Sequence, residues 1–130
     1  MFVLDTNTVI YFFKGMGNVQ ERIFSEAPNS LAIPSVVLYE LELGIANAKE
    51  PAKHIAQLRQ LTDVIRILPF DHIGAKKTAK INMQLENLGE SLGPADVMIA
   101  GTVLAYRGML VTPHTEAFSK VPNLAIEDWY

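Results

Sequence analysis

Short apolar runs alternate along the chain with longer segments in which apolar residues recur at helical spacing. The short runs predict five β-strands, at residues 1–5, 30–34, 66–70, 109–112 and 124–129. The longer segments predict helices at residues 6–14, 19–27, 35–49, 51–65, 71–89 and 93–108. Strands that alternate with helices in this way predict an α/β fold with a mostly parallel sheet. We therefore expect a three-layer α/β/α sandwich, formed by residues 1–130 as a single domain.

Residues with strong capping preferences mark several of the predicted helix ends. Thr6 or Asn7 suits the N-cap of the first helix, and Ser35 suits that of the third. Asp71 suits the N-cap of the fifth helix, and Gly89 suits its C′ position. The predicted helix starts mark the ends of the loops that follow the strands, and ligands of parallel sheets bind at these loops.

Two aspartates lie where an apolar element meets a loop. Asp5 directly follows the first strand and either caps the next helix or ligates a metal ion. Asp96 lies in the first turn of a helix that is apolar nearly all round, which predicts a central and partly buried position. A buried charge is costly unless it is paired or bound to a metal. Asp96 is therefore either a partner of the helix dipole or a second metal ligand.

A third acid is expected from the helix predicted at residues 35–49. At about 100° per residue, Glu40 lies nearer the apolar face of this helix than Glu42 does. We therefore predict that Glu40 points inward and that Glu42 is solvated.

The three acids predict a particular kind of chemistry if the strand ends gather them. Neighbouring carboxylates raise each other's pKa, and a hard divalent cation such as Mg²⁺ or Mn²⁺ relieves that repulsion. A water held by such a cation is a nucleophile for phosphodiester hydrolysis. No protein nucleophile is then required, which suits a chain without cysteine and without a Gly-x-Ser-x-Gly motif.

Composition and charge narrow the classes of partner. With 49% hydrophobic and 19% charged residues, the chain is typical of a globular protein. Its formal net charge of −3 means that binding to nucleic acid requires a local basic patch or a bound cation. The run Lys76, Lys77 and Lys80 either contacts phosphates or is an ordinary solvated face. No apolar stretch approaches the length that spans a bilayer, so we expect a cytoplasmic protein without a membrane partner.

Four blocks of the sequence resemble the VapC-type toxins of the PIN-domain ribonuclease family. They read VLDTNTVI, PSVVLYELELG, GPADVMIAGTVLAYRG and LVTPHTEAFSKVPNLAIEDWY, and they follow the family's order over essentially the whole chain. The resemblance implies an endoribonuclease that depends on Mg²⁺ or Mn²⁺ and cuts tRNA or other structured or single-stranded RNA. It also implies a cognate antitoxin encoded beside the toxin, and a homodimer that assembles further with that antitoxin.

The same resemblance assigns roles to individual residues. Carried over position by position, the metal ligands are Asp5, Asp96 and Glu40, with Glu40 binding directly or through a water. Thr6 and Asn7 match the small polar residues that follow the first acid of the family motif.

The last block departs from the family pattern. Related sequences continue from the strand that ends at Thr112 with Thr-Asn-Asn or Thr-x-Asp, often followed by Arg-Glu-Phe, whereas this chain reads TPHTEAF. His114 therefore stands where the family carries an acid or an amide. It either contacts metal or phosphate, or it caps the strand end without any chemistry. Imidazole suits Mn²⁺ better than Mg²⁺.

Two alternatives to an active ribonuclease follow from these residues. The altered TPHTEAF stretch allows a PIN-like module that has lost activity and only binds a partner. The stretch LDTNT also comes close to the opening motif of haloacid-dehalogenase-like phosphatases, but Asn7 stands where that family carries its general acid.

Overall fold

The computed structural model describes all 130 residues and shows one wholly parallel sheet. Its five strands lie in the order β3-β2-β1-β4-β5 and pair only in parallel. They are β1 (Phe2–Leu4), β2 (Leu31–Pro34), β3 (Arg66–Leu68), β4 (Met109–Val111) and β5 (Ile126–Glu127). Central strands buried on both faces need apolar side chains at successive positions, as in the β2 sequence LAIP, all of which is buried. The prediction of a parallel α/β sheet is confirmed.

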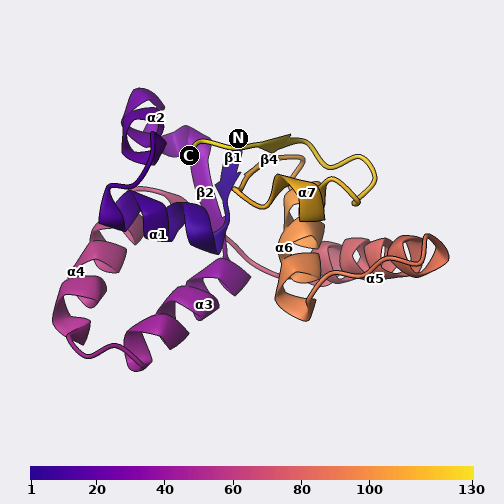
Figure 1. Ribbon diagram of the computed structural model, residues 1–130, viewed down its shortest axis with the longest axis horizontal. Coiled ribbons are helices and arrows are strands. Elements are labelled where there is room, and N and C mark those ends of the chain that lie inside the picture. The colour runs from indigo at the N-terminus through magenta and orange to yellow at the C-terminus, as the bar shows by residue number, and fades with distance from the viewer.

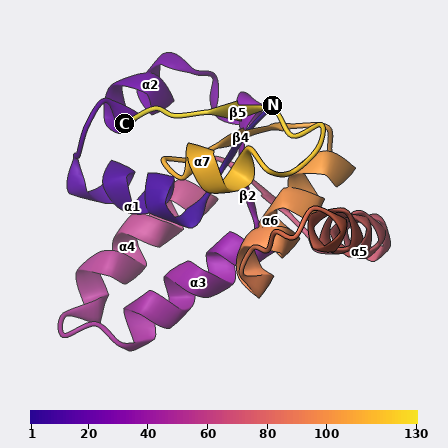
Figure 2. The same cartoon turned by 45° about the vertical axis from the view of Figure 1, so that its right-hand side comes forward.

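Seven helices flank this sheet on both sides. They are α1 (Thr6–Lys14), α2 (Val19–Ser25), α3 (Ser35–Ala46), α4 (Pro51–Thr62), α5 (His72–Asn87), α6 (Pro94–Ala105) and α7 (Thr115–Phe118). Figures 1 and 2 show α1, α3 and α4 on one flank and the paired α5 and α6 on the other. The three-layer architecture expected from the sequence is therefore present. None of these helices combines the length and the apolar composition that crossing a membrane requires.

The order of the strands places a crevice beside β1. The chain builds β1, β2 and β3 outward in one direction, then returns to add β4 on the other side of β1. In parallel sheets, ligands bind beyond the carboxyl ends of the strands at such a reversal. Asp5 follows β1 and Thr112 follows β4, so the fold brings these two residues to the same edge.

Two of the capping predictions are wrong. Asp5, and not Thr6 or Asn7, is the N-cap of α1, because Asp5 is the last extended residue and its side chain reaches the Thr8 amide. The N-cap of α3 is Pro34, so Ser35 is the first helical residue. Its hydroxyl instead accepts a 3.1 Å hydrogen bond from the Phe70 amide and anchors the loop after β3.

The capping predictions for α5 are confirmed. Asp71 accepts a 3.2 Å hydrogen bond from the Gly74 amide at the start of the helix. Gly89 follows the last turn with a φ of +70°, a left-handed conformation in which glycine carries no steric cost. Two short elements were not predicted: α7, and a 3₁₀ turn at Pro28–Ser30. Neither is long enough to show a period in the sequence.

Candidate metal centre

Asp5 is held rigidly at the carboxyl end of β1. Its amide donates to the Val111 carbonyl of β4 at 3.1 Å, and the residue is only 4% exposed. Oδ1 accepts a 2.8 Å hydrogen bond from the Thr8 amide, and Oδ2 accepts one of 2.5 Å from the Thr112 hydroxyl. Burial raises the pKa of Asp5, and these hydrogen bonds oppose that rise without cancelling it.

Asp96 reaches the same region from the first turn of α6. It is partly buried, and burial is the main cause of its raised pKa. The carboxylates of Glu40 and Asp5 raise that pKa further by repulsion, whereas His114 opposes the rise. Because charges act on one another in this way only at short range, the fold has brought β1, α3, α6 and the loop after β4 together.

Glu40 extends into this cluster from the middle of α3. Its Oε1 accepts a 2.6 Å hydrogen bond from the Thr6 hydroxyl at the start of α1. Glu42 is exposed, so the structure places Glu40 rather than Glu42 at the edge where Asp5 lies. Thr6 therefore positions an acid that lies 34 residues away along the chain.

The loop after β4 is tied to the acids by one buried hydroxyl. The Thr112 hydroxyl donates its only hydrogen to Asp5 and accepts a 3.0 Å hydrogen bond from the His114 amide. The His114 ring in turn contacts the side-chain amide of Asn7 through Nε2. His114 is exposed, but both its backbone and its ring are held in place.

The chemistry of these side chains fits a hard divalent cation. No three histidine or acidic side chains lie in a ready-made coordination geometry. However, none of the three acids forms a salt bridge, although two of them have raised pKa values. A cluster of unneutralised carboxylate oxygens is the donor set that Mg²⁺ and Mn²⁺ prefer. The ligand roles of Asp5, Glu40 and Asp96 stay predictions, and the fold brings all three together.

Sequence reasoning missed one residue of this region, Thr8, and one contact, between Asn7 and His114. Thr8 binds Asp5 through its amide and the Val111 carbonyl through its hydroxyl, at 3.0 Å. It lies three residues after the N-cap, the spacing at which capping side chains accept a hydrogen bond, so this signal was present in the sequence. The contact between Asn7 and His114 joins residues 107 positions apart and left no local signal.

Comparison with known proteins gives a consistent pattern. The model of the PIN domain family matches residues 2–124. The tRNA(fMet)-specific endonuclease VapC of Shigella flexneri is 34% identical over 129 residues, which cover 98% of this chain and 97% of that protein. The protein of the same name from Salmonella typhimurium is 32% identical over the same shares of the two chains.

Solved structures agree with the sequence comparison. A chain in the crystal structure of VapBC2 from Rickettsia felis, bound to a DNA fragment from their promoter, superposes with a TM-score of 0.92. It is 27% identical, and the match covers 99% of this chain and 98% of that one. A chain in DNA-bound VapBC from Salmonella typhimurium also gives a TM-score of 0.92, at 31% identity and with the same coverage.

Proposed function

This chain belongs to the PIN domain family, and on that premise we propose how its acids take part in RNA cleavage. The chain is an endoribonuclease of the VapC type, the toxin of a pair whose other member is a cognate antitoxin. The phosphatase alternative does not agree with this membership. The observation that carries the mechanism is the convergence of Asp5, Glu40 and Asp96, three acids without a cationic partner.

In the proposed mechanism the protein supplies oxygen ligands and holds them still. Asp5 and Asp96 would hold Mg²⁺ or Mn²⁺, with Glu40 binding directly or through a water. When bound, the cation would activate a water and stabilise charge on the phosphate. Thr112 and Thr8 fix both oxygens of Asp5, and Thr6 fixes Oε1 of Glu40. The other oxygen of Glu40 accepts no hydrogen bond from the protein and is suited to take a proton from the attacking water.

A matched pair of variants on α3 tests the role of Glu40. Glu40→Gln should lower the rate of RNA cleavage at least roughly 10- to 100-fold, which is the loss typical even of residues that support a metal site without binding the ion directly. Glu42→Gln makes the same chemical change two residues away on an exposed face and should cleave like the wild type. Asp5→Asn and Asp96→Asn should match the Glu40 variant. Cleavage that survives these changes, or that persists in excess EDTA, contradicts the mechanism.

We propose an initiator tRNA as the first substrate to test. Two relatives that align over nearly the whole chain are named as tRNA(fMet)-specific endonucleases. The purified protein should cut initiator tRNA faster than an elongator tRNA under the same conditions, with sequencing of the new ends as the readout. Equal rates of cleavage of the two tRNAs would contradict the proposed preference for initiator tRNA, but not the ribonuclease function.

We also propose that the toxin forms a homodimer and assembles further with its antitoxin. The support is its likeness to chains from VapBC complexes. Sedimentation of the toxin alone should show the homodimer, and sedimentation with the antitoxin should show a larger complex that contains two toxin chains. A single toxin chain in both measurements contradicts the proposal.

A further inference from the structure

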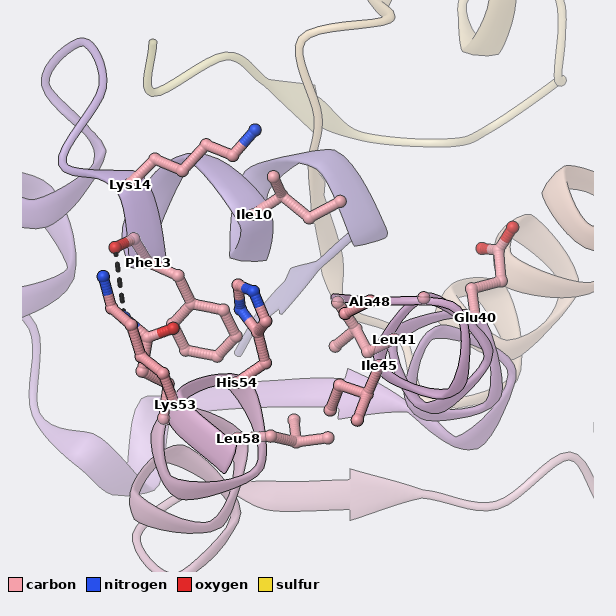
Figure 3. Close-up of a pocket in the computed structure, with 12 residues that line it drawn as sticks. Ile10, Phe13, Lys14, Glu40, Leu41, Ile45, Ala48, Lys53, His54 and Leu58 are labelled. Atoms are coloured by element: carbon pink, nitrogen blue, oxygen red, sulfur yellow. Dashed lines mark hydrogen bonds between the residues drawn. The ribbon is translucent and has the colours of Figure 1, made fainter. Parts of the chain in front are cut away.

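Glu40 lies beside a cleft, but its carboxylate points away from that cleft. The cleft has a volume of about 520 Å³, and residues of α1, α3 and α4 line it. Glu40 is one of the lining residues, yet Figure 3 shows its carboxylate turned outward from the cleft. The Thr6 hydroxyl binds this carboxylate instead, at 2.6 Å. Glu40 therefore belongs to the acid cluster and leaves the cleft without a carboxylate.

One further side chain, His114, lies within the range at which charge acts on the acid cluster. It opposes the raised pKa of both Asp5 and Asp96, and apart from the acids themselves no other charged side chain affects these pKa values. In sites that hold two divalent cations about 3.5–4 Å apart, each ion needs oxygen ligands, and carboxylates commonly supply them. Here the fourth side chain at the cluster is an imidazole and not a carboxylate.

The His114 ring is held in place and cannot replace a carboxylate. Its Nε2 atom contacts the side-chain amide of Asn7, and its backbone amide donates a 3.0 Å hydrogen bond to the Thr112 hydroxyl. That hydroxyl in turn donates to Asp5. Whichever partner donates in the contact with Asn7, Nε2 keeps no free lone pair for a metal ion. A carboxylate in the same place would offer two oxygens with about four lone pairs.

The charges at the cluster also favour one ion over two. A single divalent cation leaves the three carboxylates with a small net negative charge, whereas two cations would leave a net positive charge beside His114. Mg²⁺ depends on carboxylate and phosphate oxygens, and imidazole is not among the ligands that suit it. The donors at this site therefore suit one hard cation.

We propose that this site binds a single divalent cation, because the His114 ring, held by Asn7, stands where a fourth carboxylate would have to hold a second ion. Asp5, Glu40 and Asp96 supply the ligands of the one ion. His114 determines the number of ions through the position that it occupies. This inference deepens the proposed function and rests on it, since it assigns the number of ions to the same centre.

Counting bound ions in the absence of RNA tests this number separately from catalysis. Isothermal titration of MnCl₂ into the metal-free protein should give one ion per wild-type chain, and electron paramagnetic resonance of the unbound Mn²⁺ provides a second count. His114→Asp supplies the missing oxygens and should raise the count to two. The matched control is His54→Asp on α4, which makes the same change at an exposed position that affects neither aspartate pKa. This control should still bind one ion.

Each other outcome overturns either the inference or the function on which it rests. Two ions per wild-type chain, or one ion in folded His114→Asp, refute the limit set by His114 and leave the ribonuclease function intact. Two ions in His54→Asp refute it as well, because any added acid would then create a site. No ion in the wild type, or an unchanged count in Asp5→Asn, contradicts the proposed metal centre itself. Thermal melting identifies a variant that has lost its fold, and His114→Glu then takes the place of His114→Asp.

Discussion

At the scale of single residues, Asp5 combines two roles that the sequence presents as alternatives. One oxygen caps α1 through the Thr8 amide, and the other binds the Thr112 hydroxyl. A carboxylate oxygen can accept more than one hydrogen bond or ligand, so capping does not prevent metal ligation. The same acid can therefore stabilise the helix and hold its charge in a fixed position at the strand end.

Because its pKa is raised in the folded state, Asp96 should lower the stability of the metal-free protein in a pH-dependent way. A carboxyl group whose pKa is higher in the folded state destabilises folding once it is ionised, above that folded pKa. In EDTA, Asp96→Asn should therefore have a higher melting temperature than the wild type at pH 7. The difference should shrink as the pH falls through the raised folded pKa, and it should vanish below the unfolded-state pKa of about 3.9, where Asp96 is protonated in both states. A difference that grows on acidification contradicts this sign.

Removing the Thr112 hydroxyl should lower both the stability of the protein and its rate of RNA cleavage. Thr112→Val keeps the shape of the side chain but removes the donor to buried Asp5 and the acceptor for the His114 amide. Unfolding in urea should show a loss of about 1–3 kcal/mol, and RNA cleavage should fall as well. Thr112→Ser keeps the hydroxyl and should retain most of both, so equal behaviour of the two variants would contradict the prediction.

His114 can be separated from Thr112 because its bond to that hydroxyl comes from the backbone. His114→Ala removes the ring and its contact with Asn7 but keeps the amide, so it should destabilise folding less than Thr112→Val. Cleavage lost in His114→Ala and restored in His114→Asp would show that the family's fourth ligand position is used here. Wild-type cleavage by His114→Ala would instead assign the ring to the loop alone.

At the scale of elements, the pairing of α5 with α6 depends on one glycine. A Cβ atom on Gly101 of α6 would lie 1.9 Å from the Thr78 hydroxyl oxygen and 3.0 Å from the Thr78 Cα of α5. That hydroxyl is buried without a hydrogen-bond partner. The two helices therefore pack closely at Gly101, and this packing leaves the Thr78 hydroxyl buried without a partner. The packing of α6 against α5 also fixes the position of the first turn of α6, which carries Asp96 to the acid cluster.

Gly101→Ala should consequently destabilise the protein, by about 1–3 kcal/mol as is typical of overpacking. Thr78→Ala removes the nearest atom and should recover part of that loss in the double variant, as measured by urea unfolding. Gly44→Ala is the matched control, because its Cβ meets nothing and alanine favours a helix over glycine by about 1 kcal/mol. A Gly101→Ala protein as stable as the wild type would show that the helices can separate at little cost.

At the scale of the whole molecule, an acidic chain carries an uncompensated acid cluster at the centre of its crevice. If the cluster binds Mg²⁺, the ion should stabilise the folded protein, by about 2.7 kcal/mol at a concentration of about 100 times Kd. Thermal melting in MgCl₂ against KCl of equal ionic strength measures this effect. Asp5→Asn and Asp96→Asn should lose the shift. A shift of equal size in these variants would place the ion elsewhere on the molecule.

The sequence by itself determined the elements and the identity of the acids that meet. Apolar runs and helical periods are local properties, so all five strands and the six longer helices could be predicted from neighbouring residues. Their alternation implied a parallel sheet, and strand ends in such a sheet are where Asp5 and Thr112 had to lie. Helix periodicity likewise favoured Glu40 over Glu42.

Only the tertiary structure decided how these residues are held and what surrounds them. The bond from Thr6 to Glu40 spans 34 residues, and those from Asn7 to His114 and from Thr112 to Asp5 each span 107. The cleft beside Glu40 needs three helices to be packed before it exists. Such features depend on contacts between distant parts of the chain, and a pattern read along neighbouring positions does not contain them.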